Sequence, residues 1–381
     1  MQLLILPKGG LYMKIKHVNL NVISIPTSIL KSKYPVGNSV RVHKSWDFII
    51  VNITTSNGVR GMGYVWTPAY GTKTIYDFVQ NELKGIIVNQ DAQYSEFIWN
   101  KMWKATNYYG RKGLAILGIS MIDMALWDIK SKLASMPLHK YLGGFSNKIP
   151  VYATDGFLSF TLYELQERVE NRVEEGYKAI KLFVGNDDIK KDVERIKLTR
   201  NIIGNDIQLM IDANQAWKDI GTASRNIQYF KEFDISWIEE PLPADNVYGY
   251  QKLSDKSEIP IAGGENAYTI HEAFQYLNQN KVGIFQPDIF RIGGITGLTK
   301  AMTLAESHHI PVSPHLATEI SLPVMATSSN VKWAEYMPLF DDILNIFVDH
   351  QVIRNGYIYV SNNPGHGVEF NSKIIDNYSL F

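Results

Sequence analysis

Short apolar segments, each ending in a polar residue, recur along the chain between positions 207 and 315. They end at Asp212, Glu239 and Glu240, Glu265, Asp288 and His315, at intervals of roughly 23–27 residues. One strand, one helix and two short loops occupy about this length in a βα barrel. Because parallel barrel strands all point their carboxyl ends at one mouth, we expect these polar side chains to converge there.

The same strand–helix alternation begins at about Ile149 and continues past the five segments. Helical stretches of suitable length separate most of the candidate strands, and this alternation predicts a parallel sheet. Eight such units predict closure into a barrel. The candidate strands are Pro150–Thr154, Ala179–Phe183, Ile207–Asp212, Trp237–Glu239, Ile259–Gly263, Ile284–Gln286, Pro311–Ser313 and about Val331–Glu335.

The N-terminal part follows a different pattern. Polar and apolar residues alternate over 14–25, as in a half-buried strand, and a second strand is expected at Asp47–Thr54. The Asn57-Gly58 turn then predicts a hairpin with a returning strand. The connection from about Ser32 to Val42 is polar, and it is either a flap over a site or a surface loop.

Residues 73–142 have a helical pattern, which ends at Gly143-Gly144. Asp123 and Asp128 lie on one of these helices, and we expect them to be helix-surface or interdomain polar groups. The expected boundaries are a loose extension at 1–12 (or an ordered edge segment), an α+β domain at 13–144, the barrel at 145–348, and a tail at 349–381.

Composition excludes several classes of function. Lys+Arg and Asp+Glu both number 38 in 381 residues, so no net charge favours nucleic acid or an anionic membrane. No apolar run approaches the roughly 18 residues that span a bilayer. The chain has no cysteine, which excludes disulfides and thiolate chemistry and fits a cytoplasmic protein.

Asp212, Glu239 and Glu265 end three successive strands. A single acid in such a position is usually a helix cap or a loop residue. Three acids in phase with the barrel period favour a shared Mg²⁺, because Mg²⁺ prefers carboxylate oxygens and leaves positions open for substrate. Without a cation, three converging carboxylates would repel one another.

Three further residues belong to the predicted mouth. Asp288 and His315 end the next two strands, and a carboxylate that bonds imidazole makes a general base. Lys181, inside the apolar run AIKLFV, is expected to contact an anionic substrate, to act as a base, or to pair with an acid. Glu335 ends the eighth strand, where it is either an ordinary loop acid or part of the site.

The motifs KLF, DANQ, EEP, GEN, PD, PHL and AEY, in this order, resemble the mandelate racemase subgroup of the enolase superfamily. The loop YPVGNSV, the helix IDMALWD and the ending PGHGVEF extend this resemblance from about Met13 onward. It implies a modified (β/α)7β TIM barrel under an α+β capping domain, to which the tail at 349–381 returns. It also implies a homo-oligomer that abstracts a proton α to a carboxylate.

The resemblance further implies roles for the residues of the mouth. Asp212, Glu239 and Glu265 would hold one Mg²⁺, and His315 with Asp288 would form the base dyad. Glu335 would be a hydrogen-bonding acid near the substrate carboxylate.

One residue departs from the pattern. The racemase motif on the second strand is Lys-x-Lys, whereas Phe183 occupies the place of the second base here. His315 alone can remove the C2 proton and return it to a departing C3 hydroxyl. We therefore expect dehydration of a sugar acid (a pentonate or hexonate) to the 2-keto-3-deoxy acid, with Lys181 binding the carboxylate electrostatically.

Three alternatives remain open: a racemase or epimerase with Lys181 as second base, a Schiff-base aldolase that uses Lys181, and a protein that keeps the fold without catalysis. The mouth shows no large apolar signal for an aryl substrate. Asn214, Arg291 and Tyr34 are the expected contacts to sugar hydroxyls.

Overall fold

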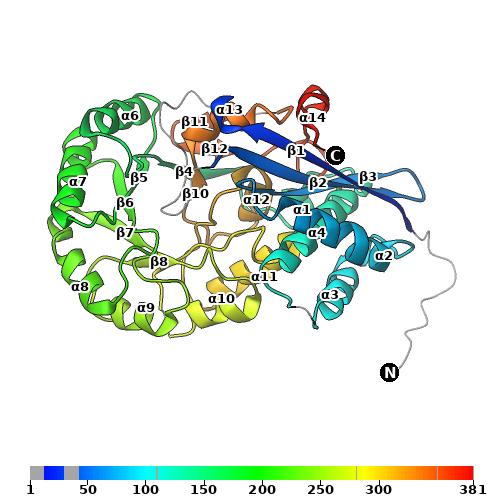
Figure 1. Ribbon diagram of the computed structural model, residues 1–381, viewed down its shortest axis with the longest axis horizontal. Coiled ribbons are helices and arrows are strands. Elements are labelled where there is room, and N and C mark those ends of the chain that lie inside the picture. Colours follow the sequence, from blue (N-terminus) through cyan, green and yellow to red (C-terminus); the bar gives the residue numbers. More distant parts are fainter. Residues whose placement is uncertain (1–12, 30–42, 109, 280, 350, 381) are drawn as a thin grey trace.

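The computed structural model describes residues 13–29, 43–108, 110–279, 281–349 and 351–380. Tyr34, the loop at about Ser32–Val42 and residues 1–12 lie outside these residues. The described chain forms a barrel with helices around it, and a sheet with its own helices packs at one side of the barrel (Figure 1). The predicted fold class, an α/β barrel with an α+β cap, is confirmed. No helix in the described ranges is both long and apolar enough to cross a bilayer.

The cap is built on a three-stranded antiparallel sheet. Strands β1 (Ile15–Pro26), β2 (Ser45–Thr55) and β3 (Arg60–Thr67) follow one another in the order β1-β2-β3. The predicted hairpin joins β2 to β3, and Gly58 takes the positive φ of 84° that its turn requires.

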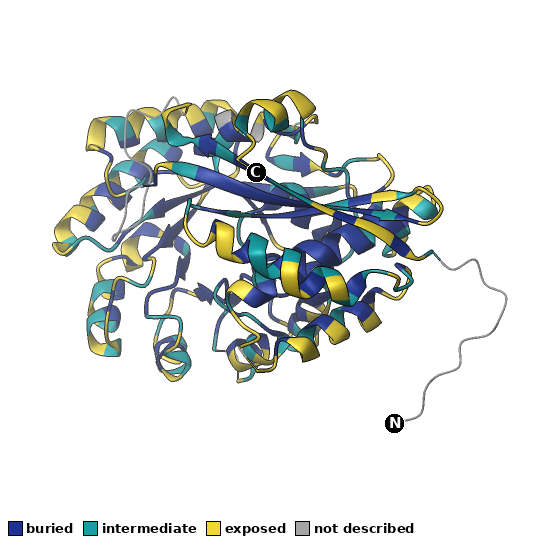
Figure 2. Ribbon diagram, turned by 45° about the vertical axis from the view of Figure 1, so that its right-hand side comes forward, coloured by how far each residue is buried: buried dark blue, intermediate teal, exposed yellow. Residues whose placement is uncertain are grey.

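Helices of the cap cover one face of this sheet. They are α1 (Thr72–Phe78), a π-helical turn (Val79–Leu83), α2 (Lys84–Ile87), α3 (Ser95–Ala105), α4 (Leu114–Leu133) and α5 (Leu138–Tyr141). Helix α4 lies directly on β3, because Gly61 and Gly63 leave no side chain between strand and helix. A Cβ at Gly63 would collide with the carbonyl of Met121. Figure 2 shows α4 buried between the sheet and the barrel helices.

The barrel strands run parallel and in chain order. They are β4 (Lys148–Thr154), β5 (Ala179–Phe183), β6 (Gln208–Asp212), β7 (Ile235–Glu239), β8 (Ile261–Gly263), β9 (Ile284–Phe285) and β10 (Ala334–Tyr336). The predicted strand at Pro311–Ser313 is reduced to single bridges from Val312 to Phe285 and Val331. β10 pairs with β4, so the eight positions close into a ring.

Helices surround this ring. They are α6 (Leu162–Glu174), α7 (Ile189–Ile203), α8 (Ile220–Gln228), α9 (Val247–Ser254), α10 (Ile270–Leu277), α11 (Gly294–Ser307) and α12 (Thr318–Met325). Short 3₁₀ turns lie at Thr27–Ile29, Lys231–Phe233 and Pro338–Phe340, and α13 (Asp341–Leu344) follows the last of these.

The interior of the barrel is layered. Successive residues of a strand face opposite sides, so every second side chain points inward. One inner layer is apolar and contains Tyr152, Ala179, Met210, Trp237, Ala262, Ile284 and Trp333. Two residues further along the strands, the inward side chains include Lys181, Asp212 and Glu239, which places a polar layer above an apolar floor.

The tail first joins the barrel and then the cap. β11 (Ile353–Arg354) and β12 (Tyr357–Tyr359) form a hairpin, and β12 pairs antiparallel with the start of β4. The following residues cross to the cap, where α14 (Ser372–Tyr378) lies near β1 and the backbone N–H of Leu380 donates to Val22.

Candidate active site

Lys181 lies at the centre of the polar layer. Its ammonium is 2.6 Å from Glu239 Oε2, 2.9 Å from Glu335 Oε1 and 3.7 Å from Asp212 Oδ2, and its side chain is 1% exposed. Burial lowers the pKa of this lysine, but the neighbouring carboxylates outweigh burial and raise the pKa well above its ordinary value. Lys181 is therefore a protonated cation.

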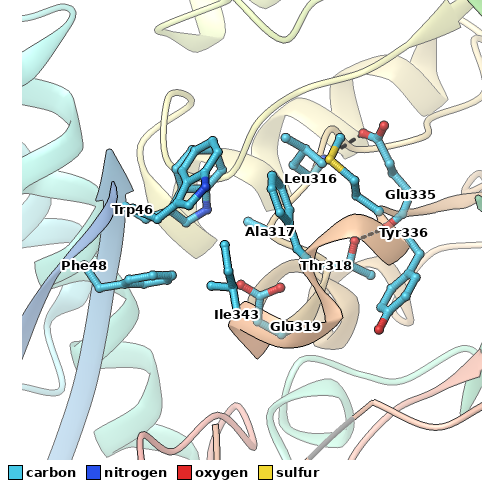
Figure 3. A pocket seen from close by; sticks show the side chains of 12 residues that line it. Trp46, Phe48, Leu316, Ala317, Thr318, Glu319, Glu335, Tyr336 and Ile343 are labelled. Atoms are coloured by element: carbon cyan, nitrogen blue, oxygen red, sulfur yellow. Dashed lines mark hydrogen bonds between the residues drawn. The ribbon is translucent and has the colours of Figure 1, made fainter. Parts of the chain in front are cut away.

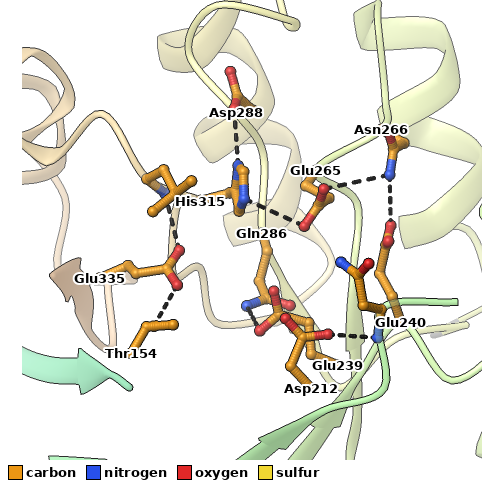
Figure 4. Close-up of polar contacts among 12 residues, drawn as sticks. Thr154, Asp212, Glu239, Glu240, Glu265, Asn266, Gln286, Asp288, His315 and Glu335 are labelled. Carbon is orange, nitrogen blue, oxygen red and sulfur yellow. Dashed lines mark hydrogen bonds and ion pairs between the residues drawn. The ribbon is translucent and has the colours of Figure 1, made fainter. Parts of the chain in front are cut away.

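Asp212 and Glu239 end β6 and β7, and their carboxyls lie beside each other (Figure 4). Both are within 4 Å of the Lys181 ammonium. Burial raises the pKa of Asp212 well above its usual range, and the charge of Glu239 raises it further. Burial also raises the pKa of Glu239. Glu239 Oε2 accepts hydrogen bonds from Lys181 and Gln286, whereas Oε1 is buried without a hydrogen-bond partner among the described residues. One lysine does not compensate the negative charge here.

Glu265 follows β8 and lies on the other side of the mouth. Its Oε1 accepts a hydrogen bond of 2.9 Å from Arg291, and its Oε2 is 3.4 Å from His315 Nε2. Burial would raise the pKa of Glu265, but His315 and Arg291 lower it below the ordinary value. Glu265 is therefore ionised.

The three acids have the donor chemistry for a hard divalent cation. They are buried and lie on consecutive strands, and Glu239 keeps an unpartnered oxygen. In the part of the chain that the structure describes, no three acidic or histidine side chains already enclose a metal position. Lys181 and Arg291 hold Glu239 and Glu265 in ion pairs instead. The residues fit Mg²⁺ by type, charge and burial, and binding would require Glu265 to exchange part of its ion pair.

His315 and Asp288 form the predicted pair. His315 Nδ1 is 2.8 Å from Asp288 Oδ2, and the two backbones form a parallel bridge. Asp288 Oδ1 accepts from the backbone N–H groups of Phe290 and Arg291, which fixes the carboxylate. With Nδ1 engaged, Nε2 of His315 faces the mouth (Figure 4). Burial lowers the pKa of His315, but Glu265 and Asp288 outweigh burial and raise it to about 9.

Glu335 bridges the dyad and the lysine. Its Oε1 accepts from Thr154 and Lys181, and its Oε2 accepts from the backbone N–H of Leu316 at 2.9 Å. Against the effect of burial, Lys181 and His315 lower the pKa of Glu335 to about 2. Glu335 is thus a buried, ionised carboxylate within the mouth.

The three predicted substrate contacts are placed differently. The side chain of Arg291 bonds Glu265 and Asn266. Asn214 is exposed, with a positive φ of 43°, and its backbone N–H donates to Asp212. Tyr34 lies outside the described residues. The roles of these residues in substrate binding stay predictions.

Two polar residues near the acids were given no role in the site by the sequence reasoning. Gln286 follows β9 and donates a hydrogen bond of 2.7 Å to Glu239. Its position in the sequence, two residues before Asp288, could have indicated that it faces the same side of the strand. Glu240 accepts from Gln215 and Asn266, and burial followed by the charge of Glu265 raises its pKa to about 8. Glu240 thereby links the loops that follow β6 and β8.

Phe183 lies on the same face of β5 as Lys181, two residues further toward the mouth. Its ring stacks on Phe157, with centroids 4.9 Å apart. Phe157 belongs to the loop after β4, and Arg195 holds this loop by donating to the carbonyls of Gly156 and Phe157. An apolar wall therefore stands where the Lys-x-Lys pattern would place a base.

A ring of parallel strands with acids at successive ends, under a cap of antiparallel sheet and helices, defines a capped barrel of the enolase type. Family models agree: residues 22–143 match the mandelate racemase/muconate lactonizing enzyme N-terminal domain, and residues 164–374 match the enolase C-terminal domain-like family. The chain belongs to the mandelate racemase subgroup of the enolase superfamily, as the motifs predicted.

Two of the similar proteins are sugar-acid enzymes by name. The chain is 33% identical to a 3,6-anhydro-alpha-L-galactonate cycloisomerase of Streptomyces coelicolor, over 85% of this chain and 89% of that protein. It is 33% identical to an arabinonate dehydratase of Saccharolobus solfataricus, over 87% and 90%. A crystal structure of a Streptomyces coelicolor racemase with bound magnesium superposes with a TM-score of 0.90 at 29% identity, covering 96% of this chain and 100% of that one.

Proposed function

We propose that this protein dehydrates a sugar acid, an aldonate, to the 2-keto-3-deoxy acid in a Mg²⁺-dependent reaction. The observation that carries the proposal is the asymmetry of the mouth. A His315–Asp288 dyad lies on one side, and the Phe183–Phe157 stack lies on the side of β5. The names of the relatives, dehydratase and cycloisomerase, support the same substrate class.

Asp212, Glu239 and Glu265 would hold the metal. When bound, Mg²⁺ supplies positive charge that stabilises the enediolate formed after proton removal. Lys181 carries a fixed positive charge beside these acids and is suited to hold the substrate carboxylate. Glu335, ionised and close to both Lys181 and Leu316 N, orients this lysine.

The proton inventory needs one base. In its neutral form, His315 Nε2 takes the proton from C2, and the electron pair of that C–H bond forms the enediolate. A cation bound at Glu265 would offset the negative charge that raises the pKa of His315 and would favour the neutral imidazole. The C3–O bond then breaks, and the proton on His315 goes to the leaving hydroxyl, which departs as water. The resulting enol tautomerises to the 2-keto-3-deoxy acid. Asp288 holds the imidazole tautomer that presents Nε2 throughout.

Lys181 is poorly suited to the rival reactions. A racemase would need it as a neutral base, and an aldolase would need it as a neutral nucleophile. Its contacts with Glu239, Glu335 and Asp212 raise its pKa and keep it protonated. Phe183 supplies no proton acceptor in its place.

The cycloisomerase relative makes isomerisation of a related acid the second candidate, because it can begin at the same base. A panel of acid sugars, incubated with protein and Mg²⁺ in deuterated water, separates the possibilities. Dehydration gives a keto acid that has lost one water, whereas isomerisation loses no water and changes the mass only by exchange of hydrogen for deuterium. Recovered substrate that carries deuterium with inverted configuration, without keto acid, contradicts the proposal.

Activity that survives EDTA, with borohydride trapping on Lys181, indicates the aldolase. Mg²⁺-dependent turnover of any of these acids excludes a catalytically silent protein.

A further inference from the structure

An apolar cavity lies between the cap and the barrel, next to the mouth. Trp46, Phe48 and Trp66 reach it from the cap sheet, and Phe340 and Ile343 from the segment after β10 (Figure 3). No single stretch of the sequence signals this cavity. Its aromatic residues come from strands far apart in the sequence, and no single segment displays them together.

The cavity is continuous with the proposed catalytic residues through two neighbours. Leu316, which directly follows His315, lines it, and so does Glu335. The backbone N–H of Leu316 donates to Glu335 Oε2, so this wall is fixed. A substrate with its carboxylate near Lys181 would extend its far end toward this cavity.

The size of the cavity limits what enters it. Its volume is about 50 Å³. An apolar cavity of about 150 Å³ holds benzene, so this cavity is small for an aryl ring and better suited to the last carbons of a hexonate.

The charged side chains that line the cavity, among the described residues, are acidic. Among the described residues that line the cavity, no side chain is Lys, Arg or His, and two, Glu319 and Glu335, are acids. Glu319 accepts a hydrogen bond from Tyr64, yet burial still raises the pKa of Glu319 above its ordinary value. A second carboxylate brought here would lose its hydration without meeting a cation from these residues. The indole Nε1 of Trp46 is buried without a partner among the described residues, so it can donate to a neutral hydroxyl.

We infer that the cavity at Trp46, Trp66 and Glu319 is a subsite for the uncharged far end of the substrate, and that it selects monocarboxylic sugar acids, including 6-deoxy acids, against dicarboxylic ones. This inference rests on the proposed function, because it takes the other end of the substrate to lie at Lys181 and the metal ligands.

The test compares three acids that differ only at C6. A hexonate, its 6-deoxy form and the corresponding dicarboxylate carry CH₂OH, CH₃ and COO⁻ on the same C2–C5 configuration. D-galactonate, 6-deoxy-D-galactonate and galactarate are one such set, and the other hexose configurations supply further sets. Calorimetric titration into the His315→Asn protein with Mg²⁺ measures binding without turnover. Within the set of three acids that binds best, we expect both monocarboxylates to bind at least about tenfold more tightly than the dicarboxylate.

A variant pair examines the cavity itself. Met337 lines it and is partly exposed, so Met337→Lys places an ammonium there, with Met337→Leu as the matched neutral control. Met337→Lys should reduce or reverse the preference, and Met337→Leu should keep it. If the His315→Asn protein, with no change in the cavity, binds the dicarboxylate equally or more tightly, the inference is overturned, even if Met337→Lys fails to fold. So does a folded Met337→Lys protein with an unaltered preference.

The failure of this inference can be told apart from failure of the proposed function. A protein that dehydrates dicarboxylates best refutes the subsite and keeps the dehydratase. A protein that forms keto acid from none of the acids refutes the dehydratase, and the order of binding still decides whether the cavity selects an uncharged end.

Discussion

Phe183 stacks on Phe157, with ring centroids 4.9 Å apart and planes inclined by 22°. The two rings form an apolar wall on the β5 side of the mouth, while His315 faces the mouth from the opposite part of the ring of strands. Under the proposed function, proton transfer would be confined to one face of the substrate. A water-filled gap at this position would allow exchange from the second face, and the stack fills it.

Phe183→Lys recreates the Lys-x-Lys pattern and should add a second proton acceptor. We expect recovered substrate to gain deuterium with inverted configuration and the rate of keto-acid formation to fall. Proton NMR of the recovered acid measures both. Phe183→Leu, which restores no base, is the matched control and should show no inversion. Inversion in neither variant would show that position 183 does not face the α-carbon.

His315→Asn should lower keto-acid formation by about 10²–10⁴-fold, the usual contribution of a general base. Mg²⁺ affinity, measured by calorimetry, should change little, because His315 is not among the proposed ligands. Asp288→Asn leaves the base in place but alters its tautomer, so its activity should also fall. Activity of His315→Asn equal to that of the unaltered protein would remove His315 from the mechanism.

Lys181→Met removes the cation from a cluster of buried carboxylates. Removal of one partner from a buried ion pair costs about 3–5 kcal/mol, so the melting temperature should fall clearly in EDTA. Added Mg²⁺ should raise the melting temperature of this variant more than it raises that of the unaltered protein. The control is Lys300→Met, which breaks an exposed ion pair with Glu96 and should cost at most about 1 kcal/mol. Equal effects of Mg²⁺ on all three proteins would argue against a metal at these acids.

Asp123 gives stability a dependence on pH that has nothing to do with catalysis. It is fully buried in α4 and accepts hydrogen bonds from the backbone N–H and the hydroxyl of Thr296 in α11. Burial raises the pKa of Asp123 from 3.8 to about 7, against the lowering effect of these bonds. Between these values the folded protein keeps a proton that the unfolded chain releases, so this residue lowers stability as pH rises.

Asp123→Asn should therefore flatten the fall in the free energy of unfolding between pH 4 and pH 7, the range set by the two pKa values of Asp123. Urea unfolding of both proteins at several pH values measures the difference in slope, which isolates Asp123 from other titrating groups. The variant also replaces a hydrogen-bond acceptor, so a constant loss at all pH values is expected as well. Parallel curves for the two proteins would refute the raised pKa.

Strand positions were predictable because their signal is local. Short apolar segments between helical stretches placed β5 at Ala179–Phe183, as observed, and β6 and β7 within two residues at their starts. The barrel period then brought the five strand-end residues to one mouth. The weak point was Pro311–Ser313, where only Val312 bridges its neighbours, because hydrogen bonding depends on partners that one segment does not reveal.

Contacts between distant segments were not predictable. Asp123 and Asp128 were expected at a helix surface or between domains, and both are fully buried. The surface alternative was wrong for both, whereas Asp123 does join the cap to the barrel. The engagement of Arg291 with Glu265 and the cavity at Trp46 likewise depend on three-dimensional proximity. The homo-oligomer and the cytoplasmic location stay predictions.

The cap can finish folding only after the C-terminal tail has been synthesised. Phe370 packs against Tyr64 and Phe48 of the cap sheet, His366 contacts Met62, and Leu380 hydrogen-bonds to Val22. The first strands to leave the ribosome therefore wait for residues 366–380 before their contacts are complete, with the whole barrel made in between. A cap that depends on late residues matures after the barrel, so a released chain that ends before Phe370 would carry a formed barrel beside an incomplete cap.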